Sequence, residues 1–415
     1  MSATHDMTTF HKRITMAGSL IAIGIVFGDI GTSPLYTLNA VFHGRVITEA
    51  IALGSLSCIF WTLFLQTTLK YVIITLQADN KGEGGILSLY ALIRRYSGKW
   101  LIYFAMAGGA FLMADGIITP PISVASAIEG VQAVVPGFNT VPVVIVILIG
   151  LFLFQQFGTH KIGKIFGPVM LCWFGFIGVL GALALSSNWG VLKALNPYYA
   201  FQMLVNESGG FWLLGSIFLC TTGAEALYSD MGHCGRNNIR ASWIFIKIAL
   251  VLSYAGQTAW LLNHTGQEVG ALSPFYHIVP QSIFWPSLII ATLATIIASQ
   301  ALISGCFTLI NEAIRLGLWP KHTVQFPSNI KGQLYIPAIN WFLMVGCIGM
   351  VLHFRESTKM EAAFGLSVTL TMLMSTILIN FYLRIKRVPW VFIVIITGLF
   401  LSVEAGFLIA NLQKI

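Results

Sequence analysis

Three short stretches of the sequence place carboxylates inside otherwise apolar segments. The first, GIVFGDIGTSPLYTL at residues 24–38, combines Asp29 with glycines, Pro34 and Tyr36. Glycine lowers the cost of leaving helical geometry and proline removes a backbone N–H, so the stretch predicts an interrupted helix. An interruption at membrane depth is tolerated only where it lines a cavity or is buried in protein. Asp29, Tyr36 and the freed carbonyls offer the oxygen ligands that a hard cation prefers.

The alternative interpretation is a kink in which Asp29 forms an ion pair with a buried base. No Lys or Arg lies near this stretch, and we expect Lys247 to be the only buried base elsewhere. A carboxylate at the centre of a membrane costs about 3 kcal/mol even on the lenient insertion scale. We therefore favour a cation site at Asp29.

The second stretch, ADGIITPPISVASAIEG at 114–130, carries a stripe of oxygen-bearing side chains. Asp115, Thr119 and Ser123 are spaced i, i+4 and i+8, which places them on one face of a helix. Two adjacent prolines are expected to loosen the helical hydrogen bonding. Hydroxyls that bond back to their own helix would account for the Thr and the Ser, but not for Asp115. The stripe therefore predicts a second wall of the cation site.

The third stretch, CTTGAEALYSDMGH at 220–233, places Thr222 and Glu225 three residues apart. We expect Glu225 to lie deeper than Asp230, which we place near the cytoplasmic interface. Desolvation disfavours the charged form of a buried carboxylate, so such a group can carry a proton. A nearby cation acts in the opposite direction, and cation and proton should therefore compete. The alternative is a permanently protonated Glu225 that holds neighbouring helices together.

The whole chain is too apolar to fold as a soluble core. Of its 415 residues, 56% are hydrophobic and 9% are charged. Apolar runs of about 18 residues or more recur along it, the length that crosses a bilayer. We predict an all-α polytopic membrane protein with eleven transmembrane helices, at about 17–42, 50–76, 100–133, 141–156, 163–186, 209–232, 241–264, 283–316, 336–354, 360–383 and 388–411.

The basic residues predict the orientation. Of 23 Lys and Arg, 16 lie in loops on one side of this topology and five on the other, which are Arg45, Lys193, Arg355, Lys359 and Lys414. Cytoplasmic loops carry the excess of Lys and Arg, so residues 1–16 should be a cytoplasmic N-terminus and the C-terminus should lie outside. The net charge of +8 is spread over loops and forms no stripe, which argues against nucleic acid as a partner.

Motifs for covalent or ATP-driven chemistry are missing from the sequence. It contains no GxxxxGK[ST] phosphate loop and no TVGYG potassium-channel filter. The six cysteines show no CxxC spacing and are expected to be reduced core residues. We therefore expect neither an enzyme nor a bound cofactor. No sequence repeat is visible, although inverted repeats of spans 1–5 and 6–10 are compatible with the topology.

The three stretches, together with KGEGGILSLYALIRR and ASQALISGCFTL, resemble blocks of the KUP/HAK/KT potassium uptake family in the same order. The resemblance implies proton-coupled potassium uptake by a fold similar to amino-acid/polyamine/organocation carriers. In that fold two inverted five-helix repeats, here about 17–186 and 209–383, carry interrupted helices 1 and 6. Position by position, it implies proton coupling at Glu225, K⁺ held among Asp29, Asp115 and Glu225, and K⁺-binding side chains at Asp29, Tyr36, Asp115, Thr119, Ser123 and Thr222.

The resemblance also divides the chain. It implies a ten-helix transport core at 17–383 and an additional transmembrane helix at 388–411, with the family's cytoplasmic C-terminal domain absent after Ile415. The expected function is K⁺:H⁺ symport across the cytoplasmic (inner) membrane, with K⁺ and H⁺ as transported ions, no cofactor, and a homodimer left open. The alternatives are a carrier of the same fold for an amino acid or another organic solute, and a K⁺-binding membrane sensor that transports nothing.

Overall fold

The computed structural model describes residues 14–80, 82–96, 98–157, 160–270, 272–326 and 334–414. The predicted N-terminal segment 1–16 therefore lies almost wholly outside the described residues. Helices make up most of the described chain, which contains isolated β-bridges but no strand. The predicted all-α class is confirmed.

Helices of the first half occur in this order: α2 (Met16–Ile25), α3 (Gly28–Thr32), η1 (Ser33–Leu35), α4 (Thr37–Phe42), α5 (Glu49–Thr62), η2 (Leu63–Ile74), η3 (Thr75–Gln77), α6 (Ile86–Ile93), α7 (Leu101–Glu129), η4 (Gly130–Ala133), α8 (Val141–Phe154), η5 (Gln155–Phe157) and α9 (His160–Leu185).

Those of the second half are η6 (Trp189–Leu195), α10 (Pro197–Asn206), η7 (Phe211–Leu213), α11 (Leu214–Ile217), η8 (Phe218–Thr221), α12 (Ala226–Ser229), α13 (Met231–Cys234), α14 (Arg236–Asn263), α15 (Pro274–His277), η9 (Gln281–Ile283), α16 (Phe284–Arg315), α17 (Pro337–Phe354), α18 (Ser357–Ile385) and α19 (Trp390–Leu412).

Helices with the length and composition needed to span a membrane recur along the described chain. Nine helical segments are long and apolar enough to cross a bilayer, and the bent pair Met16–Ile25 and Gly28–Phe42 makes a tenth. The remaining predicted span, α8, has 14 residues and is shorter than the usual crossing. On the outside of the bundle, large apolar side chains such as Phe342 and Phe392 are 59% exposed, as expected where a helix faces lipid.

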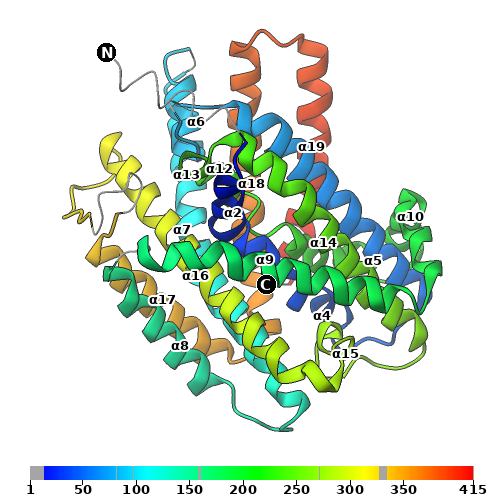
Figure 1. Ribbon diagram of the computed structural model, residues 1–415. Helices are drawn as coiled ribbons and strands as arrows, with labels where there is room; N and C mark the ends of the chain where they lie inside the picture. The colour runs from blue at the N-terminus through cyan, green and yellow to red at the C-terminus, as the bar shows by residue number, and fades with distance from the viewer. Residues whose placement is uncertain are drawn as a thin grey trace.

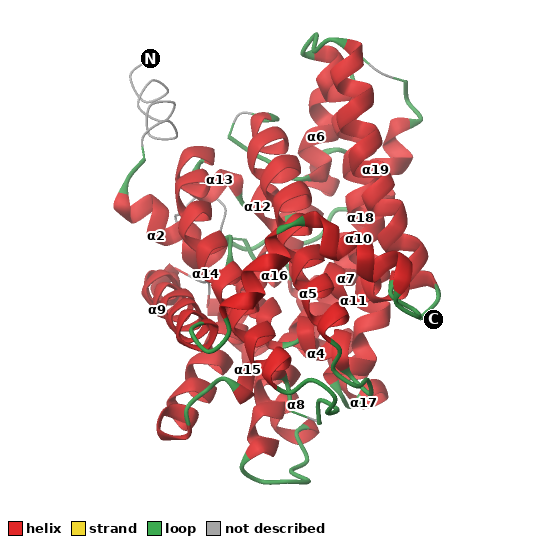
Figure 2. Cartoon of the chain, turned by 90° about the vertical axis from the view of Figure 1, so that its right-hand side faces the viewer, coloured by secondary structure: helices red, strands yellow, loops and turns green. Residues whose placement is uncertain are grey.

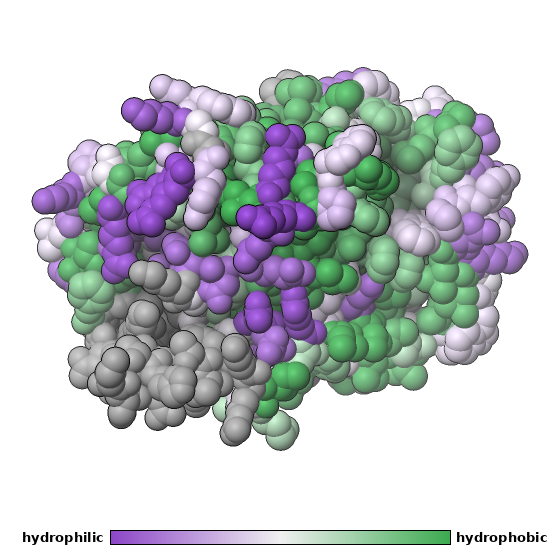
Figure 3. All heavy atoms as spheres, turned by 90° about the horizontal axis from the view of Figure 1, so that it is seen from above, coloured by the Kyte–Doolittle hydropathy of each residue, from purple (hydrophilic) through white to green (hydrophobic). Residues whose placement is uncertain are grey.

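The helices form one bundle (Figure 1). Within it α9 packs along α14, and α7 and α19 both pack along α18. In the turned view of Figure 2 the short helices α4 and α15 lie toward the lower end of the bundle, and α6 and α13 lie toward its upper end. Seen from above, the end of the molecule near α6 and α13 gathers many hydrophilic side chains (Figure 3).

The first predicted interruption lies between α2 and α3. The two segments are bent by 64°. The bend falls at Val26–Phe27, before Asp29, whereas Pro34 lies beyond it in the 3₁₀ turn η1. A Cβ on Gly28 would lie 2.8 Å from the Cα of Ala298, so this glycine lets α3 approach α16 closely. Close packing on α16, rather than the proline, therefore accompanies the bend.

The second interruption lies between η8 and α12. Thr222 has an extended backbone (φ −48°, ψ 135°), and Gly223 follows with φ +79°. A positive φ favours glycine because other L-residues are strained there. The chain becomes helical again only at Ala226.

The second predicted span changes its helical geometry halfway. Its first part is α5, and its second part is the twelve-residue π-helix η2. The hydroxyl of Thr75 donates to the carbonyl of Lys70, five residues back, at 2.7 Å. Arg240 donates to the carbonyls of Val72 and Ile73 near the end of η2. π-Helical turns are rare and occur frequently at functional sites, and this one was not predicted from the sequence.

Two other local expectations differ from the structure. The helix α7 continues through Pro120 and Pro121 instead of opening there. The block KGEGGILSLYALIRR does form a short helix, α6, but most of its side chains are buried against α7 and α18.

Candidate cation site

The two interrupted segments meet at Asp29. A Cβ built on Gly223 would lie 2.8 Å from the Cβ of Asp29 and 2.9 Å from the amide nitrogen of Ile30. The break after η8 therefore lies directly against the first turn of α3. Only a residue without a side chain fits at this contact.

Asp29 is an unpaired carboxylate within the described part of the chain. Its side chain is 4% exposed, and neither carboxylate oxygen has a hydrogen-bond partner among the described residues. It lies in the first turn of α3, where the unsatisfied N–H groups of a helix favour negative charge. A buried carboxylate without a partner costs free energy unless it meets a proton or a cation. The kink with an Asp29 ion pair is not what the structure shows.

Tyr36 brings a second bare oxygen to the same place. Its side chain is 1% exposed, and its hydroxyl lies beside Thr32 and Thr222 and near Asp29. That hydroxyl makes no well-formed hydrogen bond within the described chain. A carboxylate and a phenolic oxygen, both unpartnered, therefore lie together where the two breaks meet.

More of the backbone carbonyls near the first break accept hydrogen bonds than the sequence predicted. Several accept hydrogen bonds from side chains, in the pairs Thr32 to Asp29, Ser33 to Ile30, Trp173 to Gly31, Thr37 to Ser33, Gln257 to Pro34 and Ser273 to Leu35. A carbonyl oxygen has a second lone pair, so these groups can still contact an ion.

The α7 stripe lies against this site. Thr119 donates to the carboxylate of Asp115 at 2.5 Å. One turn further along, the hydroxyl of Ser123 lies 3.4 Å from that of Thr32 on α3. Asp115 is also close enough to Asp29 for their charges to interact. Asp115 and Ser123 on α7 thus lie near the first interrupted segment.

Glu225 lies on the far side of the second break and has different partners. Its Oε1 accepts a hydrogen bond from the hydroxyl of Tyr71 at 2.7 Å, and the hydroxyl of Ser375 lies 3.5 Å away. Thr222, the expected neighbour of Glu225, donates instead to the carbonyl of Leu219. The break between them separates the two side chains.

Asp115 on α7 and Glu225, which follows the second break, both line a small cavity of about 20 Å³. Asp230 is also among its lining residues. Asp230 is 4% exposed, and its expected position near the cytoplasmic interface stays a prediction. Within the described ranges no three His, Cys, Asp or Glu side chains converge on one ion position. Asp115 instead lies within electrostatic range of both Asp29 and Glu225.

Sequence reasoning missed a polar stripe on η2. Lys70 is fully buried and pairs with Glu404, so the expectation that Lys247 is the only buried base is wrong. Lys247 itself is partly exposed and lies over the ring of Phe64. Tyr71, beside Lys70, is the donor to Glu225. The spacing of LQTTLKYV at 65–72, with polar residues one helical turn apart, is the signal that could have revealed this stripe.

A helical membrane protein whose two interrupted helices meet at a buried carboxylate belongs to the class of secondary transporter folds. Comparison with known families then identifies the chain more narrowly. Residues 16–415 match the model of the K⁺ potassium transporter integral membrane domain, and the chain belongs to this family.

Curated relatives support the assignment. The chain is 54% identical over 418 residues to a probable potassium transport system protein Kup from Flavobacterium psychrophilum, covering 100% of this chain and 64% of that protein. It is 55% identical over 410 residues to the protein of the same description from Cytophaga hutchinsonii, covering 97% of this chain and 62% of that one. The chain therefore spans less than two thirds of the length of these relatives.

Solved structures agree on the fold. A crystal structure of a mutant manganese transporter from Eremococcus coleocola superposes with a TM-score of 0.54 at 14% sequence identity, covering 100% of this chain and 87% of that one. A second mutant of the same transporter gives 0.53 with the same coverage. Identity this low shows a shared fold and nothing about the ion.

Proposed function

We propose that this chain moves K⁺ inward across the cytoplasmic membrane together with H⁺. The family assignment and the curated Kup relatives support potassium as the ion. K⁺ and H⁺ are the transported cargo, and no covalent step is involved. The coupling to protons is the finer part of the proposal and rests on the arrangement of the carboxylates.

One observation carries the proposal: the unpartnered carboxylate of Asp29 beside the unpartnered hydroxyl of Tyr36, where the two breaks meet. Oxygen ligands replace the hydration shell of K⁺ in membrane proteins. We assign Asp29 and Tyr36 as direct ligands, with Thr222 from the second break beside them. Asp115, Thr119 and Ser123 form the opposite wall of the same site.

Glu225 is the proposed proton carrier. Asp29, Asp115 and Glu225 cannot all stay ionised in a medium of low dielectric when no cation is present. Asp29 and Asp115 lie beside the oxygens suited to holding K⁺, whereas Glu225 is held by the neutral donor Tyr71. Protonation of Glu225 when K⁺ leaves would balance the charge, and thereby link K⁺ movement to the proton gradient.

The proposed orientation places the N-terminal side in the cytoplasm. The connection between α18 and α19, which carries Lys386 and Arg387 and follows Arg384 in the last turn of α18, lies at the top of Figure 1, the end whose hydrophilic side chains appear in Figure 3. An excess of Lys and Arg marks the cytoplasmic side. The inverted repeat of spans 1–5 and 6–10 and a homodimer remain proposals.

Growth tests the proposed function directly. A bacterium that lacks its own potassium uptake systems should grow on low K⁺ when it expresses this chain. The variant Asp29→Asn should not restore growth, whereas Asp79→Asn, which removes an exposed carboxylate outside the site, should restore it. Equal growth with and without the chain, at matched membrane expression, would contradict the proposal.

A further inference from the structure

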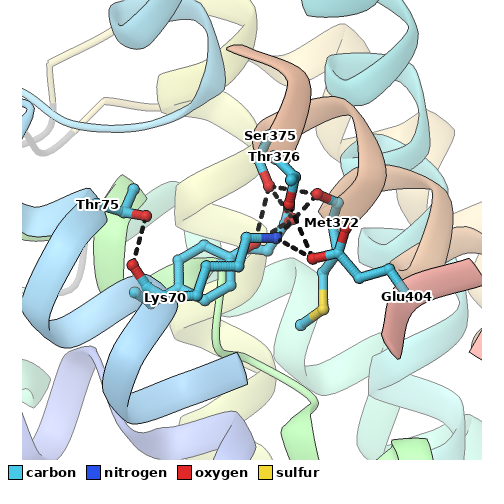
Figure 4. Close-up of polar contacts among 8 residues, drawn as sticks. Lys70, Thr75, Met372, Ser375, Thr376 and Glu404 are labelled. Carbon is cyan, nitrogen blue, oxygen red and sulfur yellow. Dashed lines mark hydrogen bonds and ion pairs between the residues drawn. The ribbon is translucent and has the colours of Figure 1, made fainter. Parts of the chain in front are cut away.

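A buried ion pair, Lys70–Glu404, lies next to the proposed proton site. Nζ of Lys70 on η2 lies 2.7 Å from Oε1 of Glu404 on α19, and both side chains are 0% exposed. Nζ also donates to the carbonyl of Met372, and the hydroxyl of Thr376 donates to the same Glu404 oxygen at 2.8 Å. Figure 4 shows Lys70 reaching across to Glu404 beneath α18.

Stability alone is a poor explanation for this pair. Removing two charges from water is expensive, and replacing a buried pair by uncharged side chains of similar volume is often neutral or stabilising. The second oxygen of Glu404, Oε2, is buried with no hydrogen-bond partner in the described part of the chain. A pair that is costly and incompletely satisfied points to a use for its charges.

The pair continues into the proposed proton site. Nζ of Lys70 lies 4.8 Å from the ring centroid of Tyr71, whose hydroxyl donates to Glu225 at 2.7 Å. Ser375, one residue from Thr376, lies 3.0 Å from the same Tyr71 hydroxyl. The charges of Lys70 and Glu404 both lie within electrostatic range of Glu225. Contacts between polar groups thus run from α19 through η2 and α18 to Glu225.

We propose that Lys70 and Glu404 are positioning residues that set the charge facing Glu225. Glu404 holds the ammonium group of Lys70 away from Glu225 and neutralises it, so that Glu225 keeps a neutral donor, Tyr71, and exchanges a proton as K⁺ comes and goes. This role rests on the proposed function of Glu225. It also makes α19, outside the predicted ten-helix core, a working part of the transport site.

Other groups also face Glu225 and bear on its proton exchange. They are Asp115 from α7, Cys306 from α16, Asp230 after α12, and Tyr71 and Ser375. None of these is changed in the experiment below. Any shift that depends on Lys70 and Glu404 is therefore measured against a constant background.

Opposite shifts in a pH profile test the proposal. Glu404→Gln leaves the Lys70 ammonium uncompensated, which favours the ionised form of Glu225, so Rb⁺ uptake in proteoliposomes should need a lower pH by about one unit. Lys70→Met leaves a lone carboxylate, which favours protonated Glu225, so half-maximal uptake should move to higher pH by a similar amount. The double variant should return close to the wild-type profile.

Lys247→Met is the matched control, because Lys247 is partly exposed on another helix and lies over Phe64 rather than beside a carboxylate. Its pH profile should be that of the wild type. Lower uptake in both single variants with an unshifted pH midpoint would show that the pair only holds α19 in place, and would overturn the proposal.

Failure of the inference is distinguishable from failure of the proposed function. If wild-type protein takes up Rb⁺ with a pH dependence that the single variants do not change, the inference is wrong and the function stands. If wild-type protein in liposomes takes up no Rb⁺ at any pH, the function itself is wrong, and the inference falls with it.

Discussion

Asp29 and Glu225 are both buried carboxylates at helix breaks, yet their surroundings differ. Neither oxygen of Asp29 has a hydrogen-bond partner in the described chain, whereas Oε1 of Glu225 accepts one from Tyr71. The unpartnered hydroxyl of Tyr36 also lies near Asp29, while Glu225 lies near the charged pair Lys70–Glu404. We propose that this difference separates a K⁺ ligand, Asp29, from a proton carrier, Glu225.

The largest expected effect is at Asp29. Asp29→Asn keeps the shape of the side chain and removes the negative charge that we propose binds K⁺. Rb⁺ uptake by intact cells should fall at least about tenfold, the change that corresponds to about 1.4 kcal/mol. Membrane expression, followed on blots, should persist. Uptake equal to that of the wild type would contradict the different roles that we propose for Asp29 and Glu225.

Glu225→Gln should separate binding from coupling. The amide mimics a permanently protonated Glu225, so Rb⁺ should still bind and exchange across the membrane while accumulation driven by an inward proton gradient is lost. Exchange of labelled for unlabelled Rb⁺ in proteoliposomes measures the first, and net uptake at an imposed pH difference measures the second. Glu356→Gln, at an exposed carboxylate, is the control and should retain both activities. Loss of exchange along with accumulation would place Glu225 among the K⁺ ligands.

Gly223→Ala tests the contact between the breaks. The new methyl carbon would lie 2.8 Å from the Cβ of Asp29, and alanine is strained at the φ of +79° that Gly223 adopts. Either the carboxylate of Asp29 is displaced or the two interrupted segments move apart. We expect several-fold lower uptake and a lower melting temperature in detergent. Gly44→Ala is matched to it, because Gly44 also has a positive φ, +64°, but nothing lies within 4 Å. That control should cost only the backbone strain, about 1 kcal/mol, and keep its uptake.

A smaller effect is expected for Tyr71→Phe, which removes the donor to Glu225 and keeps the ring. A hydrogen bond to a carboxylate favours its charged form, so its loss makes Glu225 easier to protonate. The pH for half-maximal uptake should rise by about half a unit to one unit. Tyr96→Phe, at an exposed tyrosine, should leave the profile unchanged. A fall in uptake with no change in the profile would assign Tyr71 a packing role.

The orientation of the chain in the membrane determines from which side each carboxylate is reached, but it does not change the rate of uptake. The excess of Lys and Arg on one side predicts that a fusion after α19 lies outside the cell. Alkaline phosphatase fused there should be active and green fluorescent protein should be dark. The reverse pattern would mean that one crossing was missed or wrongly assigned, with α8, the shortest, as the first suspect.

Hydropathy predicted the helices well because each crossing must be apolar over its whole length. The predicted 50–76 and 283–316 correspond closely to Glu49–Gln77 and Gln281–Arg315. The bend in the first span lies inside the predicted stretch 24–38, but its exact place accompanies the close approach of Gly28 to Ala298, far along the chain. Tertiary packing of this kind leaves no mark in a single stretch of sequence.

Candidate site residues could be proposed from the sequence where a carboxylate interrupts an apolar run, as at Asp29 and Asp115. Lys70 escaped notice because the apolar residues around it dominate the span, and its partner Glu404 lies 334 residues further on. Tyr71 looks like a core aromatic until its contact with Glu225, 154 residues away, is known. Long-range pairing of polar groups is therefore the part of the site that required the structure.

Proton influx that follows the addition of Rb⁺ is the most direct test of the different roles of Asp29 and Glu225. Proteoliposomes containing a pH-sensitive dye should acidify when Rb⁺ is added to wild-type protein. With Glu225→Gln the account predicts no acidification although Rb⁺ exchange continues, and with Asp29→Asn it predicts neither. Rb⁺-dependent proton influx at the wild-type rate in Glu225→Gln would contradict the account, because the proton would then travel on another group, with Asp115 the nearest candidate.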